Sequence, residues 1–288
     1  MQSAAGITES TATRPRFVNR FWRIATSSLL FFICFAISYG MIQVVIGLLA
    51  MFLKYGADIN YNTVYVIPRD YHYWSMARVL AVYLTAPLLW LFSGLVIFNH
   101  LRVNETREFK LRPFLFWLMI CLVNLCLGHL FFSPLGIRSY AGVGFYQTFA
   151  IVGTWMGLNE VMMGVFSGIS IILSVAFGVL IRDELLKHSF AAHRIKTSGG
   201  KTMVVAQLYF LPVILGAVPE IALCSRANIY PTMFVLLNFA FIGAGMLIKN
   251  FNDGSNIRCF KTDMLNHIPG AELLIAVTMW VVIWRFLR

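Results

Sequence analysis

The chain has 288 residues, of which 59% are hydrophobic and 12% charged, and its mean hydropathy is +0.75. Soluble domains have roughly 45–50% apolar and about 25% charged residues, so this composition is typical of an integral membrane protein. It excludes an intrinsically disordered chain and a disulfide scaffold. It also excludes a nucleic-acid-binding domain, because the basic residues behind the net charge of +11 lie between apolar segments.

Segments without Asp, Glu, Lys or Arg mark the expected transmembrane helices, each of which needs about 20 mostly apolar residues. They predict an all-α, polytopic helical membrane protein with seven transmembrane helices. The helices form a single domain over residues 21–288, after a disordered cytoplasmic tail over residues 1–20. The expected spans are residues 24–53, 79–101, 113–134, 161–181, 202–223, 229–248 and 268–286. Two of them extend past an uncharged segment, since 202–223 includes Glu220 and 268–286 includes Glu272 and Arg285.

An eighth apolar segment, residues 139–159, is not counted as a span. It contains Gly142, Gly144, Gly153 and Gly157, so its helix propensity is poor. Without this span, 16 Lys and Arg residues lie on one side of the membrane and 7 on the other, whereas eight spans give 11 against 12. The positive-inside rule therefore favours seven spans, with the N-terminus cytoplasmic and the C-terminus outside. Residues 139–159 are then a re-entrant or interfacial segment on the outer side.

Residues 54–78 form a predicted outer loop that is rich in aromatic side chains. Tyrosine and tryptophan favour the membrane interface, so we expect this loop to lie along the outer headgroups. The alternative is a recognition surface for an external partner. The residues concerned are Tyr55, Tyr61, Tyr65, Tyr71, Tyr73 and Trp74.

Ionisable side chains within spans are costly, which makes them the first candidates for a functional site. His129, Glu160 and Glu220 fall at similar depth near the outer ends of their predicted helices. If these helices are neighbours, one histidine and two carboxylates could bind a divalent metal ion or relay protons. The three residues are therefore candidate catalytic and metal-binding groups. The alternative is that each side chain reaches water at the interface and has no such role.

Other polar and helix-breaking residues concern the packing of the helices. Pro212 and Pro219, with Gly216 between them, predict a kink in the fifth span. Asn124 and Asn238 are expected to form hydrogen bonds between helices.

Part of the sequence resembles an uncharacterised family of bacterial polytopic inner-membrane proteins. The resemblance rests on residues 114–117, Gly128, residues 142–146 and the span that ends at Arg182. It covers about the middle third of the chain, and its motifs are mostly glycine and aromatic residues. It implies a location in the bacterial inner membrane and no particular activity.

The sequence contains no H-E-x-x-H zinc motif and no internal repeat. These features favour a non-catalytic integral membrane protein that acts as a subunit or scaffold of a larger membrane complex. Its expected partners are the lipid bilayer and other membrane protein subunits, without nucleic acid and without a cofactor. The alternative is a metal- or proton-dependent membrane-embedded enzyme, or a proton-coupled transporter, with its site near the outer face.

Overall fold

The described part of the chain is built from helices and one short β-hairpin, so the predicted all-α class is confirmed. The structure, a computed structural model, describes most of the chain from Arg16 onward. The described residues are 16–61, 64–67, 74–104, 109–138, 148–188, 197–224, 229–250, 259–260, 265, 267 and 269–286. The predicted tail thus lies largely outside the described residues, and the first helix begins at Arg16.

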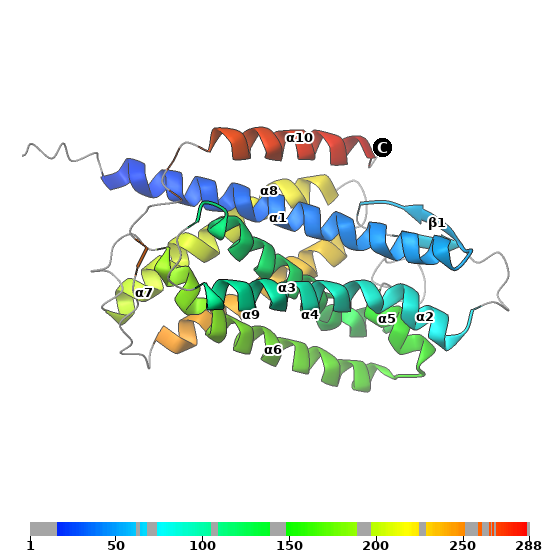
Figure 1. Cartoon of the computed structure of the whole chain (residues 1–288). Coiled ribbons are helices and arrows are strands. Elements are labelled where there is room, and N and C mark those ends of the chain that lie inside the picture. Colours follow the sequence, from blue (N-terminus) through cyan, green and yellow to red (C-terminus); the bar gives the residue numbers. More distant parts are fainter. Residues whose placement is uncertain are drawn as a thin grey trace, which may run out of the picture.

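Long helical segments run along the bundle and alternate in direction along the chain (Figure 1). They are α1 (Arg16–Phe52), α3 (Thr85–Val103), α4 (Arg112–Arg138), α6 (Glu160–Lys187), the continuous segment of α7 (Ser198–Val205), η3 (Ala206–Phe210) and α8 (Leu211–Cys224), then α9 (Tyr230–Asn250) and α10 (Gly270–Phe286).

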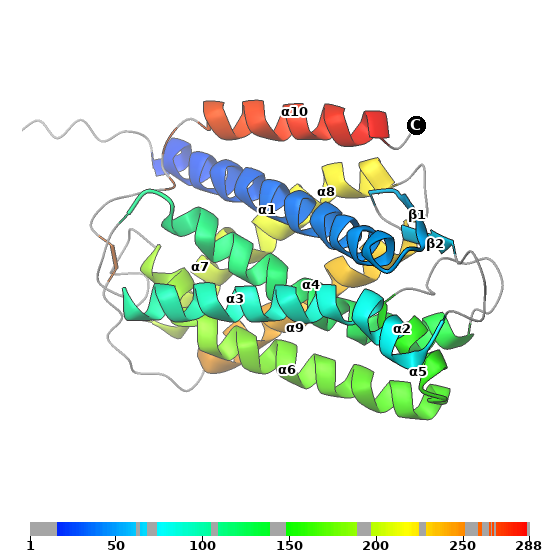
Figure 2. The same ribbon diagram turned by 45° about the vertical axis from the view of Figure 1, so that its right-hand side comes forward.

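The shorter elements gather at one end of the bundle, which we call the hairpin end (Figure 2). They are the antiparallel strands β1 (Gly56–Ile59) and β2 (Val64–Ile67), and the helices α2 (Met76–Tyr83) and α5 (Thr148–Trp155). We call the opposite end the basic end. There α1 and α4 begin and α3 and α6 finish, and each of these four helices carries Arg or Lys in that region.

Six helical segments of the described chain are long and apolar enough to cross a membrane, as expected of a membrane protein. They are Arg20–Phe52, Thr85–Val103, Arg112–Gly136, Glu160–Lys187, Ser198–Cys224 and Tyr230–Ile248. The predicted seventh span corresponds to α10, which has 17 residues and is not among the six. At about 1.5 Å per residue it is roughly 25 Å long, less than the roughly 30 Å of a bilayer's hydrocarbon core. The count of seven spans is therefore not confirmed.

Helix α10 lies on the outside of the bundle, alongside α1 and parallel to it (Figures 1 and 2). Its Ala276 is 5% exposed and packs in a small cluster with Phe32, Ile33 and Leu223. Its other face is open, and Leu274 remains 69% exposed. An open apolar face of this kind is what a lipid-facing helix presents.

The structure describes the predicted re-entrant segment from Thr148 onward, while residues 139–147 lie outside the described residues. Its described part is helical: α5 packs against α4 and α2 at the hairpin end. Burial of α5 stabilises the helix despite the low propensity of Gly153, because tertiary packing outweighs intrinsic preference. The helix ends where Gly157 adopts a left-handed φ of 68°, a conformation that favours glycine.

The fifth predicted span is interrupted by the π-helical turn η3. The N–H of Leu211 donates to the carbonyl oxygen of Ala206, five residues earlier. Pro212 follows immediately, and because proline has no N–H, the regular bond to the Leu208 carbonyl cannot form. The sequence predicts a kink from the prolines of this span, and the structure places a π-turn just before Pro212. Such turns are frequent at functional sites.

Two asparagines connect three helices inside the bundle. The Nδ2 atom of Asn238 lies 2.9 Å from Oδ1 of Asn124 and 3.0 Å from Oγ of Ser174. Asn124 donates in turn to the carbonyl oxygen of Val235, at 2.9 Å. The predicted interhelical hydrogen bonds of Asn124 and Asn238 are thus confirmed, and they join α4, α6 and α9.

Glycines allow α6 and α9 to pack backbone against backbone. A Cβ atom added to Gly245 would lie 2.0 Å from the carbonyl oxygen of Val175, and one added to Gly178 would lie 1.9 Å from that of Ile242. A backbone oxygen cannot rotate away as a side chain does, so any Cβ atom at these positions would push the helices apart.

Substitution of Gly245 by alanine is expected to lower the free energy of unfolding by about 1–3 kcal/mol, the usual cost of overpacking. Thermal denaturation of the purified protein in detergent measures this loss. Gly164→Ala is the matched control, because a Cβ atom at Gly164, also on α6, would meet no atom within 4 Å. Equal loss in both variants would contradict the close contact of α6 and α9.

Candidate functional site

Glu220 is a fully buried carboxyl group on α8, directly after Pro219. The hydroxyl of Tyr61, a residue that follows β1, donates a hydrogen bond to its Oε1 atom. Its Oε2 atom is buried and has no hydrogen-bond partner among the described residues. Burying a polar atom without a partner is costly, and ionisable groups inside a membrane bundle are usually functional. Glu220 is therefore the strongest candidate in the described structure.

Tyr61 was not predicted to take part in a site. We expected the aromatic loop to lie along the headgroups, but Tyr61 turns inward and is only 8% exposed. Burial, together with the nearby Glu220 carboxyl, raises the pKa of the Tyr61 hydroxyl well above its usual range. Tyr61 therefore keeps its proton and acts as the hydrogen-bond donor to Glu220.

Tyr39 of α1 connects Tyr61 with the rest of the buried polar side chains. Its ring meets that of Tyr61 edge to face, with centroids 5.6 Å apart. Its hydroxyl lies 3.1 Å from Oγ1 of Thr232 on α9, and that oxygen lies 3.3 Å from Sγ of Cys224. The ring of Tyr39 also stacks on the imidazole of His129, at 6.3 Å and 11°.

His129 of α4 is fully buried on the other side of Tyr39. Its Nδ1 atom lies 3.3 Å from Oγ1 of Thr148, the first residue of α5. Its Nε2 atom is buried without a hydrogen-bond partner in the described part of the chain. His129 and Glu220 therefore belong to one buried set of polar side chains, although no hydrogen bond joins them directly. We call this set the Glu220 cluster: Tyr39, Tyr61, His129, Thr148, Glu220, Cys224 and Thr232.

Glu160, the third candidate from the sequence, does not belong to the Glu220 cluster. It is the first residue of α6 and is exposed at the hairpin end. The structure thus brings together two of the three predicted residues. Among the described residues, no group of three or more His, Cys, Asp and Glu side chains could hold a metal ion. The candidate three-residue site is therefore not assembled among the described residues, because Glu160 begins its helix at the edge of the bundle.

A second group of buried charges, at the basic end, holds three helices together. Arg112 at the start of α4 is fully buried and forms a bidentate pair with Glu184 of α6, with N–O distances of 2.6 and 2.9 Å. It also donates to the carbonyl oxygens of Asn104 and Leu101 at the end of α3, at 2.6 and 3.0 Å. These carbonyls would otherwise lack partners, as at any helix C-terminus. Arg112 therefore has a structural role.

Further contacts surround this pair. The Nζ atom of Lys187 lies 3.4 Å from Oε2 of Glu184. The ring centroid of Phe260 lies 4.8 Å from Cζ of Arg112, in a cation–π contact. The N–H of Phe260 donates to the carbonyl oxygen of Lys187, at 3.0 Å. In the sequence these cations enter only the count of charges on each side of the membrane, whereas in the structure Arg112 and Lys187 belong to a buried network.

His188 lies just after α6 and is 7% exposed. Burial is the main cause that lowers its pKa to about 4. The Glu184 carboxylate, 3.9 Å from Nε2, raises the pKa, whereas the positive charges of Arg112 and Lys187 lower it. In the unfolded chain the imidazole takes up a proton near pH 6.5, but in the folded protein only near pH 4. The stability that this histidine contributes is therefore complete above about pH 6.5 and is lost as the pH falls toward 4.

Acidification is accordingly expected to destabilise the wild type through His188, by on the order of 3 kcal/mol between neutral pH and the low end of that range. His188→Gln cannot take up this proton. In this variant the free energy of unfolding should therefore fall less steeply as the pH is lowered from about 6.5 to 4. Denaturation in detergent at several pH values measures both slopes. His100→Gln, an exposed histidine at the end of α3, is the control. A slope unchanged by His188→Gln would contradict the assignment.

Comparisons with protein-family models, with curated proteins and with solved structures find no match for this chain. Its function is therefore inferred from the residues and contacts described above.

Proposed function

We propose that the chain is a proton-coupled membrane transporter in which Glu220 takes up and releases the coupling proton. The observation that carries this proposal is the fully buried Glu220 carboxyl, with Tyr61 as the partner of Oε1 and no described partner for Oε2. An ionised carboxylate needs donors at both oxygens, whereas a protonated one can itself donate through its O–H. The two protonation states therefore favour different surroundings.

This difference provides a physical basis for coupling. When Glu220 loses its proton, Oε2 requires a new donor, which a rearranged helix, a water molecule or a solute can supply. The segment that carries Glu220 is suited to rearrangement, because the π-turn η3, Pro212 and Pro219 interrupt its regular hydrogen bonds. Transporters commonly build their sites on discontinuous helices of this kind.

The proposed placement is the bacterial inner membrane, with the N-terminus in the cytoplasm and the C-terminus outside. The 16 to 7 asymmetry of Lys and Arg residues supports this orientation. The alternating helix directions in Figure 1 support a seventh crossing by α10. In this placement the hairpin end faces outward, and the Glu220 cluster lies in the outer half of the bundle.

Proteoliposomes that enclose a pH-sensitive dye test the proposal. An inward proton gradient is applied alone and in the presence of mixtures of amino acids, sugars and inorganic ions. Proton entry faster than in empty vesicles is expected in at least one of these conditions, and in that condition the Glu220→Gln variant should be inactive. Entry that never exceeds the rate in empty vesicles would contradict the transporter function.

A second candidate function, subunit or scaffold of a larger membrane complex, is favoured by one face of α6. A Cβ atom on Gly164 or on Gly168 would meet no atom within 4 Å, and Val161 beside them is 76% exposed. Two glycines four residues apart often let transmembrane helices associate closely. The proposed partners are lipid and other membrane protein subunits, without nucleic acid. Purification of the wild type in mild detergent should then yield a stoichiometric partner, and the Gly168→Leu variant should lose that partner. A wild type and a variant that are both purified as monomers would contradict this candidate.

A further inference from the structure

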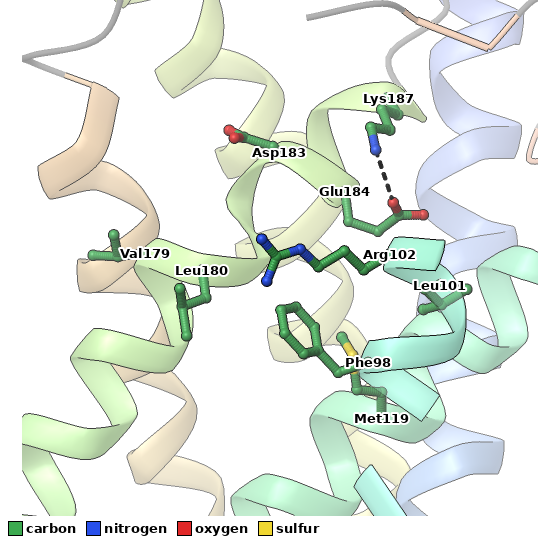
Figure 3. A pocket seen from close by; sticks show the side chains of 9 residues that line it. All are labelled: Phe98, Leu101, Arg102, Met119, Val179, Leu180, Asp183, Glu184 and Lys187. Carbon is green, nitrogen blue, oxygen red and sulfur yellow. Dashed lines mark hydrogen bonds and ion pairs between the residues drawn. The ribbon is translucent and has the colours of Figure 1, made fainter. Parts of the chain in front are cut away.

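A pocket of about 260 Å³ opens at the basic end, between α3, α4 and α6 (Figure 3). Its apolar lining includes Phe98 of α3, Met119 of α4 and Leu180 of α6. Charged side chains line the rest of it, and Figure 3 shows Arg102 reaching across from α3 toward α6. The pocket is thus amphipathic, and it lies where the ends of membrane helices meet the headgroup region.

The charges in the pocket differ in whether they are already paired. The carboxylate of Asp183 lies 2.8 Å from Nε of Arg182, and Glu184 is held by Arg112 and Lys187. Among the described residues, no hydrogen bond or ion pair joins either carboxylate to Arg102. In the described part of the chain, the Arg102 guanidinium has no hydrogen bond or ion pair. It is therefore the group in this pocket that is available to a ligand.

The local balance of charge determines the sign of that ligand. Among the described residues in and next to the pocket, four cations accompany two carboxylates; the cations are Arg102, Arg112, Arg182 and Lys187. The excess of positive charge favours an anion. A guanidinium presents a planar fork of N–H donors, which matches the oxygens of a phosphate group.

The apolar surface beside the pocket indicates that this anion carries a hydrocarbon chain. On α3, Leu95 lies three residues before Phe98 and seven before Arg102, so the three side chains share one face of the helix. Leu95 is 46% exposed. On α6, Leu173 shares a face with Leu180 in the same way and is 48% exposed. Apolar side chains thus continue from the pocket toward the middle of the bundle on both helices.

We propose that this pocket binds an anionic phospholipid, with its phosphate on Arg102 and its acyl chains along α3 and α6. Pockets between transmembrane helices that are basic on the cytoplasmic side bind anionic headgroups in this manner. The site is distinct from the Glu220 cluster, which lies toward the hairpin end, so the inference does not depend on the transporter function.

Native mass spectrometry of the full chain in detergent, titrated with phosphatidylglycerol or phosphatidylcholine, tests the site. Phosphatidylglycerol is expected to bind more tightly, and Arg102→Gln should weaken its binding by about tenfold, since one charge-assisted contact is lost. The matched control is Lys110→Gln, an exposed cation at the same end that does not line the pocket. Equal binding of the two lipids, or unchanged binding in Arg102→Gln, would overturn the proposal.

Inorganic phosphate serves as the competitor that separates a lipid from a free anion. The proposal expects millimolar phosphate to leave the bound phosphatidylglycerol in place, because phosphate lacks the apolar contacts. Displacement at such concentrations would show that the site takes a free anion and would overturn the lipid assignment. The thermal midpoint of Arg102→Gln, which should match that of the wild type, shows whether the variant is folded.

Discussion

Replacement of Glu220 by glutamine is expected to reduce proton-driven activity in proteoliposomes by about two orders of magnitude, the scale on which a positioned proton-transfer group acts. Glutamine has nearly the same shape and can still accept the hydrogen bond of Tyr61. It cannot take up or release a proton near neutral pH. The variant should therefore remain folded, with a thermal midpoint close to that of the wild type, while its coupling is lost.

Glu160→Gln is the matched control for this prediction, because it makes the same change at an exposed position near the hairpin end. Its activity should stay within about a factor of two of the wild type, given that exposed charges contribute little. Tyr61→Phe should have an intermediate effect, roughly tenfold, since it removes one hydrogen bond to the carboxyl group and leaves the proton site in place. Equal activity of Glu220→Gln and Glu160→Gln would contradict the role of Glu220.

Replacement of Arg112 by glutamine is expected to destabilise the protein by about 3–5 kcal/mol, the cost of breaking a buried ion pair from one side. Among the described residues, the variant leaves Glu184 with Lys187 as its charged partner, at 3.4 Å. It also removes donors from two backbone carbonyls at the end of α3. Denaturation in detergent at neutral pH measures the loss, and Lys110→Gln should be nearly neutral.

A double-mutant cycle separates the ion pair from the other bonds of Arg112. Arg112→Gln combined with Glu184→Gln should be less destabilising than the sum of the two single changes, because no carboxylate remains buried without its guanidinium. Recovery should be partial, since the carbonyls of Leu101 and Asn104 still lack their donor. Strict additivity would show that Arg112 and Glu184 do not stabilise one another.

The long helices could be predicted from the sequence because their signal is local. An apolar segment without charges has to be buried in lipid or protein, and the six segments of membrane-spanning length begin and end within six residues of their predictions. The helix α10 shows the limit of this signal. Its 17 residues are mostly apolar, with Glu272 in the first turn and Arg285 in the last, but whether such a helix crosses a membrane depends on what it packs against. The count of seven spans therefore stays a prediction.

The Glu220 cluster was predictable only in part. His129 and Glu220 were identified because ionisable residues are rare within apolar segments, and this signal needs no contact information. Tyr61 carried no such signal, since tyrosine in an outer loop is typical of the membrane interface. Its role depends on the β-hairpin, which returns the chain to the bundle. The position of Glu160 near the end of a predicted span indicates its depth in the membrane, but it does not show which way the side chain faces.

Infrared difference spectroscopy of the protein in lipid, recorded during a pH titration, tests most directly whether Glu220 exchanges a proton. A protonated carboxyl group has its own C=O stretching band, which shifts on deuteration and disappears on ionisation. The proposal predicts such a band in the wild type and in Glu160→Gln, changing in intensity with pH and missing at every pH in Glu220→Gln. A wild-type spectrum without this band, or one that Glu220→Gln leaves unchanged, would contradict it.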